Sequence, residues 1–329
     1  MDTLVKVDNL VKHFPVHGGL LNRVIAKVHA VNGVTFSIKR GEIVGVVGES
    51  GCGKSTLGKT LIRLFEPTAG KIIYDGREIT HLAHGYMMPF RKHIQMVFQD
   101  PNSSLNPRYS AGAMLREVVR FHQIVPHHET RDYIRELVAK VGLHDDAIEK
   151  YPHEFSGGQR QRLSIARALA VRPDFVVADE PVSSLDVSIQ AQILNLMLDL
   201  KEDFDFTMLF ISHDLKVVNY FCDRMLVMYL GYVVEELPCG EIEHIARHPY
   251  TQALLGANPA SDPTQRHELT VLEGEVPSPY NPPRGCPFVT RCPLVEPRCS
   301  QEMPPLLENA PGQRVACWAV NPQRTAAAE

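Results

Sequence analysis

One short segment constrains the fold of this chain more than any other. The nine residues Gly48–Thr56 read Gly-Glu-Ser-Gly-Cys-Gly-Lys-Ser-Thr and contain a complete G-x-x-x-x-G-K-[ST] motif. The apolar run Ile43–Val47 before it predicts a buried strand, and the residues from Lys54 to Leu64 predict a helix. In this strand–loop–helix context the backbone wraps phosphates, the lysine reaches the β and γ oxygens, and the first hydroxyl ligates Mg²⁺. The predicted nucleotide-binding residues are Gly48, Glu49, Ser50, Gly51, Cys52, Gly53, Lys54, Ser55 and Thr56.

Cys52 lies inside this loop, at a position where the motif accepts any residue. Its thiol is therefore expected to be a spectator of phosphate binding. Because a helix N-terminus lowers the pKa of a nearby thiol, we also expect Cys52 to be open to alkylation.

A second apolar strand, Phe175–Asp179, ends in two adjacent carboxylates, those of Asp179 and Glu180. Neighbouring residues of a strand point to opposite sides, so one carboxylate is expected to face Mg²⁺ and the other the attacking water. Asp179 suits the metal, and Glu180 suits the base that polarises water. A third apolar strand, Met208–Ser212, is followed by His213. A histidine there indicates little by itself, but its place downstream of the carboxylates makes it a candidate for catalysis.

The segment Phe155–Arg162 reads Phe-Ser-Gly-Gly-Gln-Arg-Gln-Arg and indicates a second anion site. Apolar residues at helical spacing continue to Ala170, so Ser156 is expected to cap a helix that begins with two glycines. Free backbone N–H groups at such a helix start attract anions. The expected contact residues are Ser156, Gly157, Gly158 and Gln159. Two phosphate sites in one chain bind either two faces of one nucleotide or a nucleotide shared between two chains.

Taken in order, these motifs resemble those of the nucleotide-binding subunits of ABC transporters. The resemblance implies ATP and Mg²⁺ as cofactors and a head-to-tail dimer in which the phosphate loop of one subunit faces Ser156–Gln159 of the other. It implies that Glu180 activates water and that His213 contacts the γ-phosphate. It also implies that Gln99 senses both Mg²⁺ and the membrane partner. The implied Mg²⁺ ligands are Ser55, Gln99 and Asp179.

Two further elements come from the same resemblance. The residues expected to cross the dimer seam are Ser183, Ser184, Leu185 and Asp186, with Ser184 at a position where the family usually has alanine. Phe14 falls where the family stacks an aromatic ring on adenine, and an ordinary packed aromatic is the alternative. Since Lys54, Glu180 and His213 are all present, the resemblance implies a chain able to hydrolyse ATP.

Two stretches, Val97–Pro107 and His248–Leu255, narrow the resemblance to the ATP-binding proteins of oligopeptide and dipeptide permeases, over roughly residues 4–320. This implies the motor subunit of a peptide importer, peripheral on the cytoplasmic face of the inner or plasma membrane. The implied partners are a second ATPase subunit (a copy or a paralogue), two transmembrane permease subunits and an extracytoplasmic peptide-binding protein. Relatives that move nickel, glutathione or oligosaccharides keep these cargoes open as alternatives.

Bulk properties agree with a peripheral subunit. The net charge of −4 argues against a nucleic-acid-binding surface. The N-terminus lacks the apolar core of a signal peptide, and the longest apolar stretch, Met225–Val234, is only about half of a membrane span. Other subunits must therefore form any pore. The alternative class is a soluble ABC ATPase that acts on DNA or ribosomes, but the two cassettes or coiled-coil insertion common there are not visible.

The alternation of strand and helix patterns predicts an α/β fold, a P-loop ATPase core with a mostly parallel sheet. We expect a nucleotide-binding domain over residues 1–255 and an oligopeptide/dipeptide-type extension over residues 256–329. Short strands and turns are expected over residues 1–47, with a surface hairpin or loop at Val16–Ala30. From about residue 105 to 170 the pattern becomes helical. There Ala113–His122 and Glu129–Val141 predict helices of a separate subdomain.

The C-terminal extension needs a source of order other than long helices, because residues 276–311 hold ten of the 24 prolines. It also contains four of the seven cysteines, Cys286, Cys292, Cys299 and Cys317. Structural disulfides are rare in a reducing compartment, and the spacing lacks the C-x-x-C pairs of zinc sites. Four thiolates suit an iron–sulfur cluster, and the resemblance implies [4Fe–4S]. Zn²⁺ and unligated thiols are the alternatives.

An arginine precedes each of these cysteines by one to three residues, namely Arg284, Arg291, Arg298 and Arg314. Cations so close favour thiolates and offset the negative charge of a cluster, and a solvated face is the alternative. We expect a cluster to staple the extension. An ATPase whose cluster gates its activity is a separate hypothesis.

Overall fold

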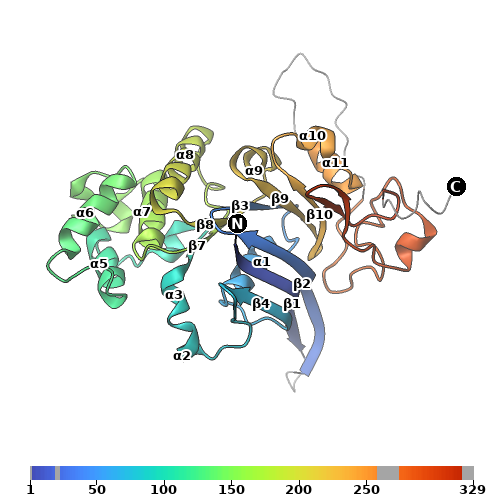
Figure 1. Ribbon diagram of the computed structural model, residues 1–329, viewed down its shortest axis with the longest axis horizontal. Helices are drawn as coiled ribbons and strands as arrows, with labels where there is room; N and C mark the ends of the chain where they lie inside the picture. Colours follow the sequence, from blue (N-terminus) through green and yellow to red (C-terminus); the bar gives the residue numbers. More distant parts are fainter. Residues whose placement is uncertain (1, 19–22, 258–273, 321–329) are drawn as a thin grey trace, which may run out of the picture. The chain divides into compact units, whose positions relative to one another are not determined.

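The structure is a computed structural model, and it describes residues 2–18, 23–257 and 274–320. The chain divides into two compact units (Figure 1). The first unit comprises residues 1–4, 38–43 and 81–211, and the second comprises residues 5–37, 44–80 and 212–329.

The first unit contains a parallel sheet in the order β8-β7-β6. Its strands are β6 (Ile94–Val97), β7 (Phe175–Asp179) and β8 (Thr207–Ser212). Every residue of β7 and β8 is buried, which is why both strands read as continuous apolar runs. Both predicted strands are therefore confirmed.

The helices of the first unit include those predicted from the sequence. They are α2 (His84–Met87), α3 (Phe90–His93), α4 (Pro101–Ser104), α5 (Ala111–Phe121), α6 (Thr130–Lys140), α7 (Gly157–Leu169) and α8 (Val187–Phe204). Short 3₁₀ turns lie at Asp145–Glu149 and Pro152–Glu154. The helices α5, α6 and α7 pack against one another (green in Figure 1). They form the predicted helical region, and α5 and α6 start and end within two residues of the predicted bounds.

The second unit contains a mixed sheet in the order β11-β12-β10-β9-β3. Its strands are β3 (Ile43–Val47), β9 (Arg224–Tyr229), β10 (Tyr232–Pro238), β11 (Leu307–Ala310) and β12 (Gln313–Val315). β3 and β9 are parallel, with Val44 opposite Arg224, whereas the other pairs are antiparallel. The antiparallel part begins where β9 turns back directly into β10.

An antiparallel sheet, in the order β2-β1-β4-β5, accounts for most of the N-terminal segment. Its strands are β1 (Thr3–Gly18), β2 (Arg23–Lys39), β4 (Ala69–Tyr74) and β5 (Arg77–Glu78). The expectation of short strands is wrong, since β1 has 16 residues and β2 has 17. A register shift between Asp8 and Val11, with Asn9 at φ 51°, lets β1 continue past an irregularity that reads as a break in the sequence. The tip of the predicted hairpin, residues 19–22, lies outside the described residues.

The helices of the second unit are α1 (Lys54–Leu61), α9 (Leu215–Phe221), α10 (Ile242–Ile245) and α11 (Pro249–Ala257). α1 ends before the predicted Leu64 because Arg63 adopts a left-handed backbone with φ 58°. No helix in the described ranges is long and apolar enough to cross a membrane.

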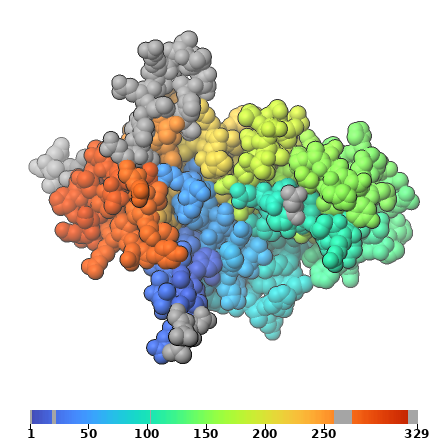
Figure 2. All heavy atoms as spheres, turned by 180° about the vertical axis from the view of Figure 1, so that it is seen from behind, coloured from blue at the N-terminus to red at the C-terminus, as the bar shows by residue number. Residues whose placement is uncertain are grey.

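The C-terminal extension consists of short elements, as its prolines predict: a 3₁₀ turn at Pro297–Ser300 and the strands β11 and β12. Two of the contacts that tie it to the rest of the second unit are made by the backbone. β12 pairs with β10, with Val315 opposite Glu235. The His29 N–H donates to the Pro279 carbonyl at 3.0 Å, and Figure 2 shows the extension (orange) beside the N-terminal strands (blue). The predicted boundary near residue 255 stays a prediction, because residues 258–273 are not described.

Candidate functional site

The phosphate loop runs from the end of β3 into α1, and two of its glycines have no substitute. A Cβ atom at Gly48 would lie 2.2 Å from the Met228 carbonyl oxygen. At Gly53, φ is +107° and a Cβ atom would lie 2.1 Å from the Ala30 carbonyl oxygen. Only glycine permits this close approach and this backbone conformation. The spacing of the motif is therefore a steric requirement of the loop.

Lys54 begins α1 and is buried, with 4% of its surface exposed. Its Nζ donates to the carbonyl oxygens of Gly48 at 2.8 Å and Glu49 at 3.1 Å, so the ammonium group lies inside the loop. The remaining loop positions follow in the predicted order, with Ser50 and Gly51 exposed and Ser55 and Thr56 half-buried in the first turn of α1. The loop thus gathers backbone, cation and hydroxyl at one helix start.

The expectation that Cys52 is open to alkylation is wrong. Its side chain is 5% exposed, and burial raises the pKa of the thiol despite the nearby Lys54. The ammonium lies 4.0 Å from the sulfur, but desolvation of the thiolate outweighs that attraction.

Two residues that hold the loop were missed by the sequence analysis. The Glu49 N–H donates to the Tyr250 hydroxyl at 2.8 Å, and the Glu49 carboxylate pairs with Arg291. Tyr250 lies in the segment that matched the peptide permeases, and Arg291 belongs to the arginine pattern of the extension. Neither the permease-like segment nor the arginine pattern indicated a contact with the phosphate loop, because the two contacts span 201 and 242 residues of sequence.

In the first unit, Asp179 and Glu180 stand at the end of β7, but strand alternation does not separate them. Asp179 is the last residue of β7 and is 1% exposed. Glu180 lies beyond the strand, in a left-handed backbone with φ 45°. Such a conformation is strained for a non-glycine residue and is frequent at functional sites. The Gln99 Nε2 donates to Glu180 Oε2 at 3.1 Å, so two predicted catalytic residues are in contact.

The helix predicted to begin after Ser156 forms as expected, and its binding of an anion stays a prediction. Ser156 caps the helix, accepting from the Gln159 N–H at 3.3 Å, while Gln159 Oε1 accepts from the Ser156 N–H at 3.0 Å. Ser156 and Gln159 are exposed. The predicted seam residues lie beside it: a Cβ atom at Gly157 would lie 3.4 Å from Leu185 Cδ2. Of the other seam residues, Ser184 and Asp186 are exposed and the Ser183 hydroxyl donates to the Glu180 carbonyl.

Two more predicted residues belong to the second unit. His213 is exposed, after β8 and before Asp214, which caps α9. Phe14 of β1 is half-buried and meets Phe65 edge to face, with ring centroids 5.3 Å apart and the Lys12 ammonium 4.6 Å from its own centroid. Its predicted contact with adenine stays a prediction.

The donor set proposed for Mg²⁺ fits that ion chemically. The carboxylate of Asp179, the amide oxygen of Gln99 and the hydroxyl of Ser55 are all hard oxygen ligands, which Mg²⁺ prefers. Asp179 is the buried member, as a carboxylate that pairs with a cation can be.

The structure does not support the predicted [4Fe–4S] cluster or the Zn²⁺ alternative. The four thiols are neighbours: burial raises the pKa of Cys286 to about 12, and Cys299, Cys292 and Cys317 add to that rise. Within the described part of the chain, however, no three His, Cys, Asp or Glu side chains form a group that could hold a metal ion. Three of the four arginines that were expected to offset the charge of a cluster pair with carboxylates instead: Arg291 with Glu49, Arg298 with Glu302, and Arg314 with Glu236.

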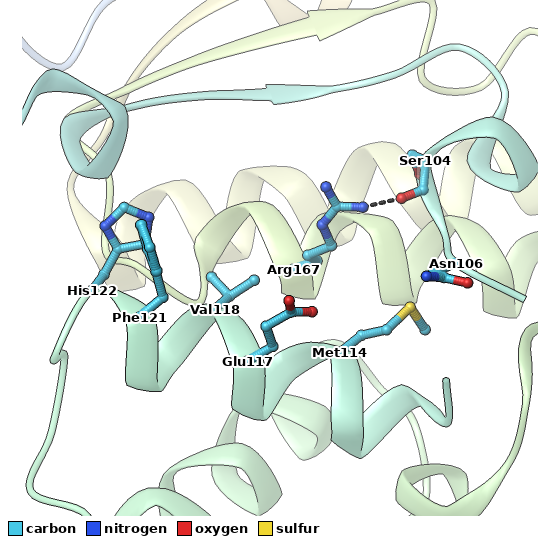
Figure 3. A pocket seen from close by; sticks show the side chains of 8 residues that line it. All are labelled: Ser104, Asn106, Met114, Glu117, Val118, Phe121, His122 and Arg167. Atoms are coloured by element: carbon cyan, nitrogen blue, oxygen red, sulfur yellow. Dashed lines mark hydrogen bonds between the residues drawn. The ribbon is translucent and has the colours of Figure 1, made fainter. Parts of the chain in front are cut away.

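A pocket of about 420 Å³ lies in the first unit (Figure 3). It is lined by Ser104, Asn106, Met114, Glu117, Val118, Phe121, His122 and Arg167. Figure 3 shows Glu117 of α5 and Arg167 of α7 pointing toward the same space, and Arg167 donates to the Ser104 carbonyl. Burial lowers the pKa of Arg167, and Glu117 acts in the opposite direction. Phe121, at the end of α5, is 65% exposed.

Comparison with known proteins places these elements in a family. The ABC transporter family matches residues 31–183, and the C-terminal region of oligopeptide/dipeptide transporters matches residues 234–299. The oligopeptide transport ATP-binding protein AppF of Bacillus subtilis is 50% identical over 319 residues, 96% of this chain and 97% of that protein. The probable peptide ABC transporter ATP-binding protein y4tS of Sinorhizobium fredii is 47% identical over 99% of this chain and 92% of its own.

Solved structures of ATP-binding cassettes are also similar to this chain. The ATP-binding cassette MJ0796, in a dimeric post-hydrolysis state bound to ADP and phosphate, matches with a TM-score of 0.64 and 29% identity. The alignment covers 72% of this chain and 99% of that one. The cbiO1 protein of Clostridium perfringens, part of the transporter complex cbiONQ, matches with a TM-score of 0.61 and 28% identity, covering 72% of this chain and 88% of its own.

Proposed function

The chain belongs to the ABC transporter family, in the group that carries the oligopeptide/dipeptide C-terminal region, and from this premise we propose that it is the ATP-hydrolysing motor subunit of a peptide importer. ATP and Mg²⁺ are its cofactors. Relatives that align over nearly their whole length are named as ATP-binding proteins of peptide transport. The cargo is the finer part of the proposal, because a motor subunit does not itself contact the transported molecule.

The contact that carries the proposal is the Gln99–Glu180 hydrogen bond. Glu180 is held in a strained left-handed backbone, and Gln99 donates to its carboxylate at 3.1 Å. A glutamate fixed in this way can accept a proton from water, and an amide from another loop can report on its state. We therefore propose Glu180 as the base and Gln99 as the residue that links the catalytic carboxylate to the loop before α4.

The roles of the other site residues are proposed from the chemical groups that they carry. The phosphate loop and Lys54 bind the phosphates, and Ser55, Gln99 and Asp179 hold Mg²⁺, which neutralises phosphate charge when it is bound. His213 contacts the γ-phosphate, and Phe14 offers a ring face to adenine.

A second ATPase subunit completes each site. Ser156 and Gln159 are exposed at the start of α7 and Gly157 and Gly158 are half-buried between them, so free N–H groups of this segment can meet the phosphates of another chain. The adjacent residues Ser183–Asp186 would then lie at the seam. We propose a head-to-tail dimer, and its second chain is either a copy or a paralogue.

The permease subunits are proposed to dock at the pocket of Figure 3. Through Ser104 and Asn106 the pocket reaches the stretch Val97–Pro107 that contains Gln99. The exposed Phe121 offers an apolar contact beside the charges of Glu117 and Arg167. A membrane-protein segment seated there would be linked to Gln99 by a few residues of chain. The subunit would then be peripheral on the cytoplasmic face, with an extracytoplasmic binding protein that supplies the peptide.

The test combines purification with one substitution. The tagged chain, isolated from its native membrane, should bring with it two multi-span membrane proteins. Glu180→Gln should retain MgATP binding and lower turnover by about 10²–10⁴-fold, while Glu202→Gln on α8 is the matched control.

Three outcomes would contradict parts of this proposal. Rapid turnover by Glu180→Gln removes Glu180 as the base. Purification with ribosomes or DNA instead of membrane proteins points to a soluble ABC ATPase. Uptake of nickel, glutathione or an oligosaccharide by the reconstituted complex, without peptide uptake, corrects the cargo and leaves the motor function intact.

A further inference from the structure

Glu49, the first variable residue of the phosphate loop, is held by two residues from far along the chain. Its N–H donates to the Tyr250 hydroxyl at 2.8 Å. Its carboxylate accepts two hydrogen bonds from Arg291, from Nη1 to Oε2 at 2.7 Å and from Nη2 to Oε1 at 3.1 Å. This bidentate geometry fixes both groups in the plane of the guanidinium. The loop is therefore tied to α11 and to the cysteine-rich extension.

Arg291 is buried around this contact. Its side chain is 5% exposed, against 26% for that of Glu49. Nη1 lies 3.4 Å from the Tyr229 hydroxyl, and the buried Nε has no hydrogen-bond partner in the described part of the chain. Glu49 is the carboxylate that the structure pairs with this guanidinium. Loss of either charge would leave the other one poorly solvated.

An aromatic cluster fixes the position of both supports. The rings of Tyr229, Tyr250 and Phe288 meet pairwise, with centroids 4.7, 5.3 and 5.4 Å apart, and all three side chains are fully buried. Phe288 lies three residues before Arg291 in the extension. Arg291 is thus placed by packed rings and does not reach Glu49 as a mobile surface side chain.

The charge of Glu49 explains why such a support is needed. A carboxylate on a loop that wraps phosphates repels the nucleotide unless a cation neutralises it. Lys54 is already engaged with the loop carbonyls and serves the phosphates. Arg291 neutralises Glu49 from the side of the extension.

We propose that Arg291 is a positioning residue for nucleotide binding, which neutralises Glu49 and, with Tyr250, fixes the phosphate loop. The C-terminal extension thereby sets the affinity of the chain for ATP. This inference rests on the proposed function, in which the loop binds MgATP.

The experiment measures MgATP binding by calorimetry and steady-state ATPase activity on the full chain. Arg291→Gln should raise Kd and KM for ATP by about tenfold, equivalent to about 1.4 kcal/mol, with a much smaller change in kcat. The double variant Glu49→Gln/Arg291→Gln should recover most of that loss, because no unpaired carboxylate remains. The matched control is Arg298→Gln in the same extension, whose partner Glu302 and own side chain are both more than half exposed. It should bind ATP as the wild type does.

Each further outcome decides the matter. If Arg291→Gln binds MgATP with wild-type affinity, the inference is overturned. It is also overturned if the double variant binds MgATP as weakly as Arg291→Gln, since Arg291 would then act through packing alone. If Arg291→Gln does not fold, Arg291→Lys decides: a retained charge should give intermediate affinity, and unchanged affinity contradicts the need for the bidentate pair. Failure of the wild-type chain to bind MgATP would instead refute the proposed function itself.

Discussion

Two helix starts in this chain are suited to phosphate, and they are held in opposite ways. α1 begins behind the phosphate loop at Gly53, whose left-handed backbone carries no side-chain cap. Residues far away in the sequence support that loop, including Tyr250 and Arg291. α7 begins at Ser156, and its capping box with Gln159 lies within four consecutive residues. One site is built by tertiary contacts, and the other is built locally.

The difference matches what the two sites are proposed to do. A loop that encloses the phosphates of a nucleotide bound to its own chain must keep a strained backbone conformation. Contacts with residues distant in the sequence make the loop rigid enough to do so. A helix start that is offered to a second chain must stay exposed, so its order has to come from its own residues. The comparison predicts that changes in α7 act on hydrolysis by the dimer, whereas changes around the loop act on a single chain.

The largest expected effect tests whether the start of α7 serves another chain. Gly157→Asp should leave MgATP binding by the isolated chain unchanged and lower hydrolysis by about 10²-fold, because a carboxylate there repels the phosphates presented to it. Calorimetry and ATPase assays check both parts. Gly85→Asp is the matched control, since a side chain at exposed Gly85 meets nothing within 4 Å. Loss of ATP binding in Gly157→Asp would mean that Ser156–Gln159 serves the nucleotide site of its own chain.

A smaller effect concerns the support of the phosphate loop at low pH. His248 precedes α11, and its Nδ1 accepts from the Tyr250 N–H at 3.1 Å. Complete burial lowers the pKa of His248 to about 3, so the unfolded chain binds more protons between pH 6.5 and 3. This contribution to stability is full above pH 6.5 and is lost as the pH falls.

His248→Asn keeps an acceptor near Nδ1 and removes the titration. Between pH 6.5 and 5, the free energy of unfolding by urea should fall by up to about 2 kcal/mol more in the wild type than in the variant. Parallel losses in the two proteins would show that His248 does not titrate on unfolding. Glu235 titrates in both proteins, so its raised pKa does not affect the difference.

The smallest effect concerns the cap of α7. Ser156→Ala should lower the free energy of unfolding by about 1 kcal/mol, measured by urea denaturation. Ser110→Ala, at the cap of α5 where Ser110 accepts from the Ala113 N–H at 3.3 Å, should lower it by a similar amount. Only Ser156→Ala should also reduce ATP hydrolysis. An equal loss of activity in both variants would mean that the cap of α7 matters for stability alone.

In the C-terminal extension, the sequence pattern did not predict the partners of the side chains. Four cysteines with neighbouring arginines predicted a metal cluster, but Arg291, Arg298 and Arg314 pair with carboxylates. A guanidinium gains more from a carboxylate, such as Glu49 for Arg291, than from a buried thiol, whose pKa burial raises. The predicted reactivity of Cys52 is also wrong, because the effect of a helix N-terminus on its thiol does not offset the burial that raises its pKa.

The sequence by itself determined the local elements: the glycine positions of the phosphate loop, the apolar strands β3, β7 and β8, and the cap of α7 at Ser156. Each depends on the conformations or hydrogen bonds of a few consecutive residues. Only the tertiary structure decided that Gln99 meets Glu180, that Glu180 is strained, and that Arg291 neutralises Glu49. The partners in these two contacts lie 81 and 242 positions apart in the sequence. Local conformational preferences do not act over such separations, so the packing of the whole unit selects each partner.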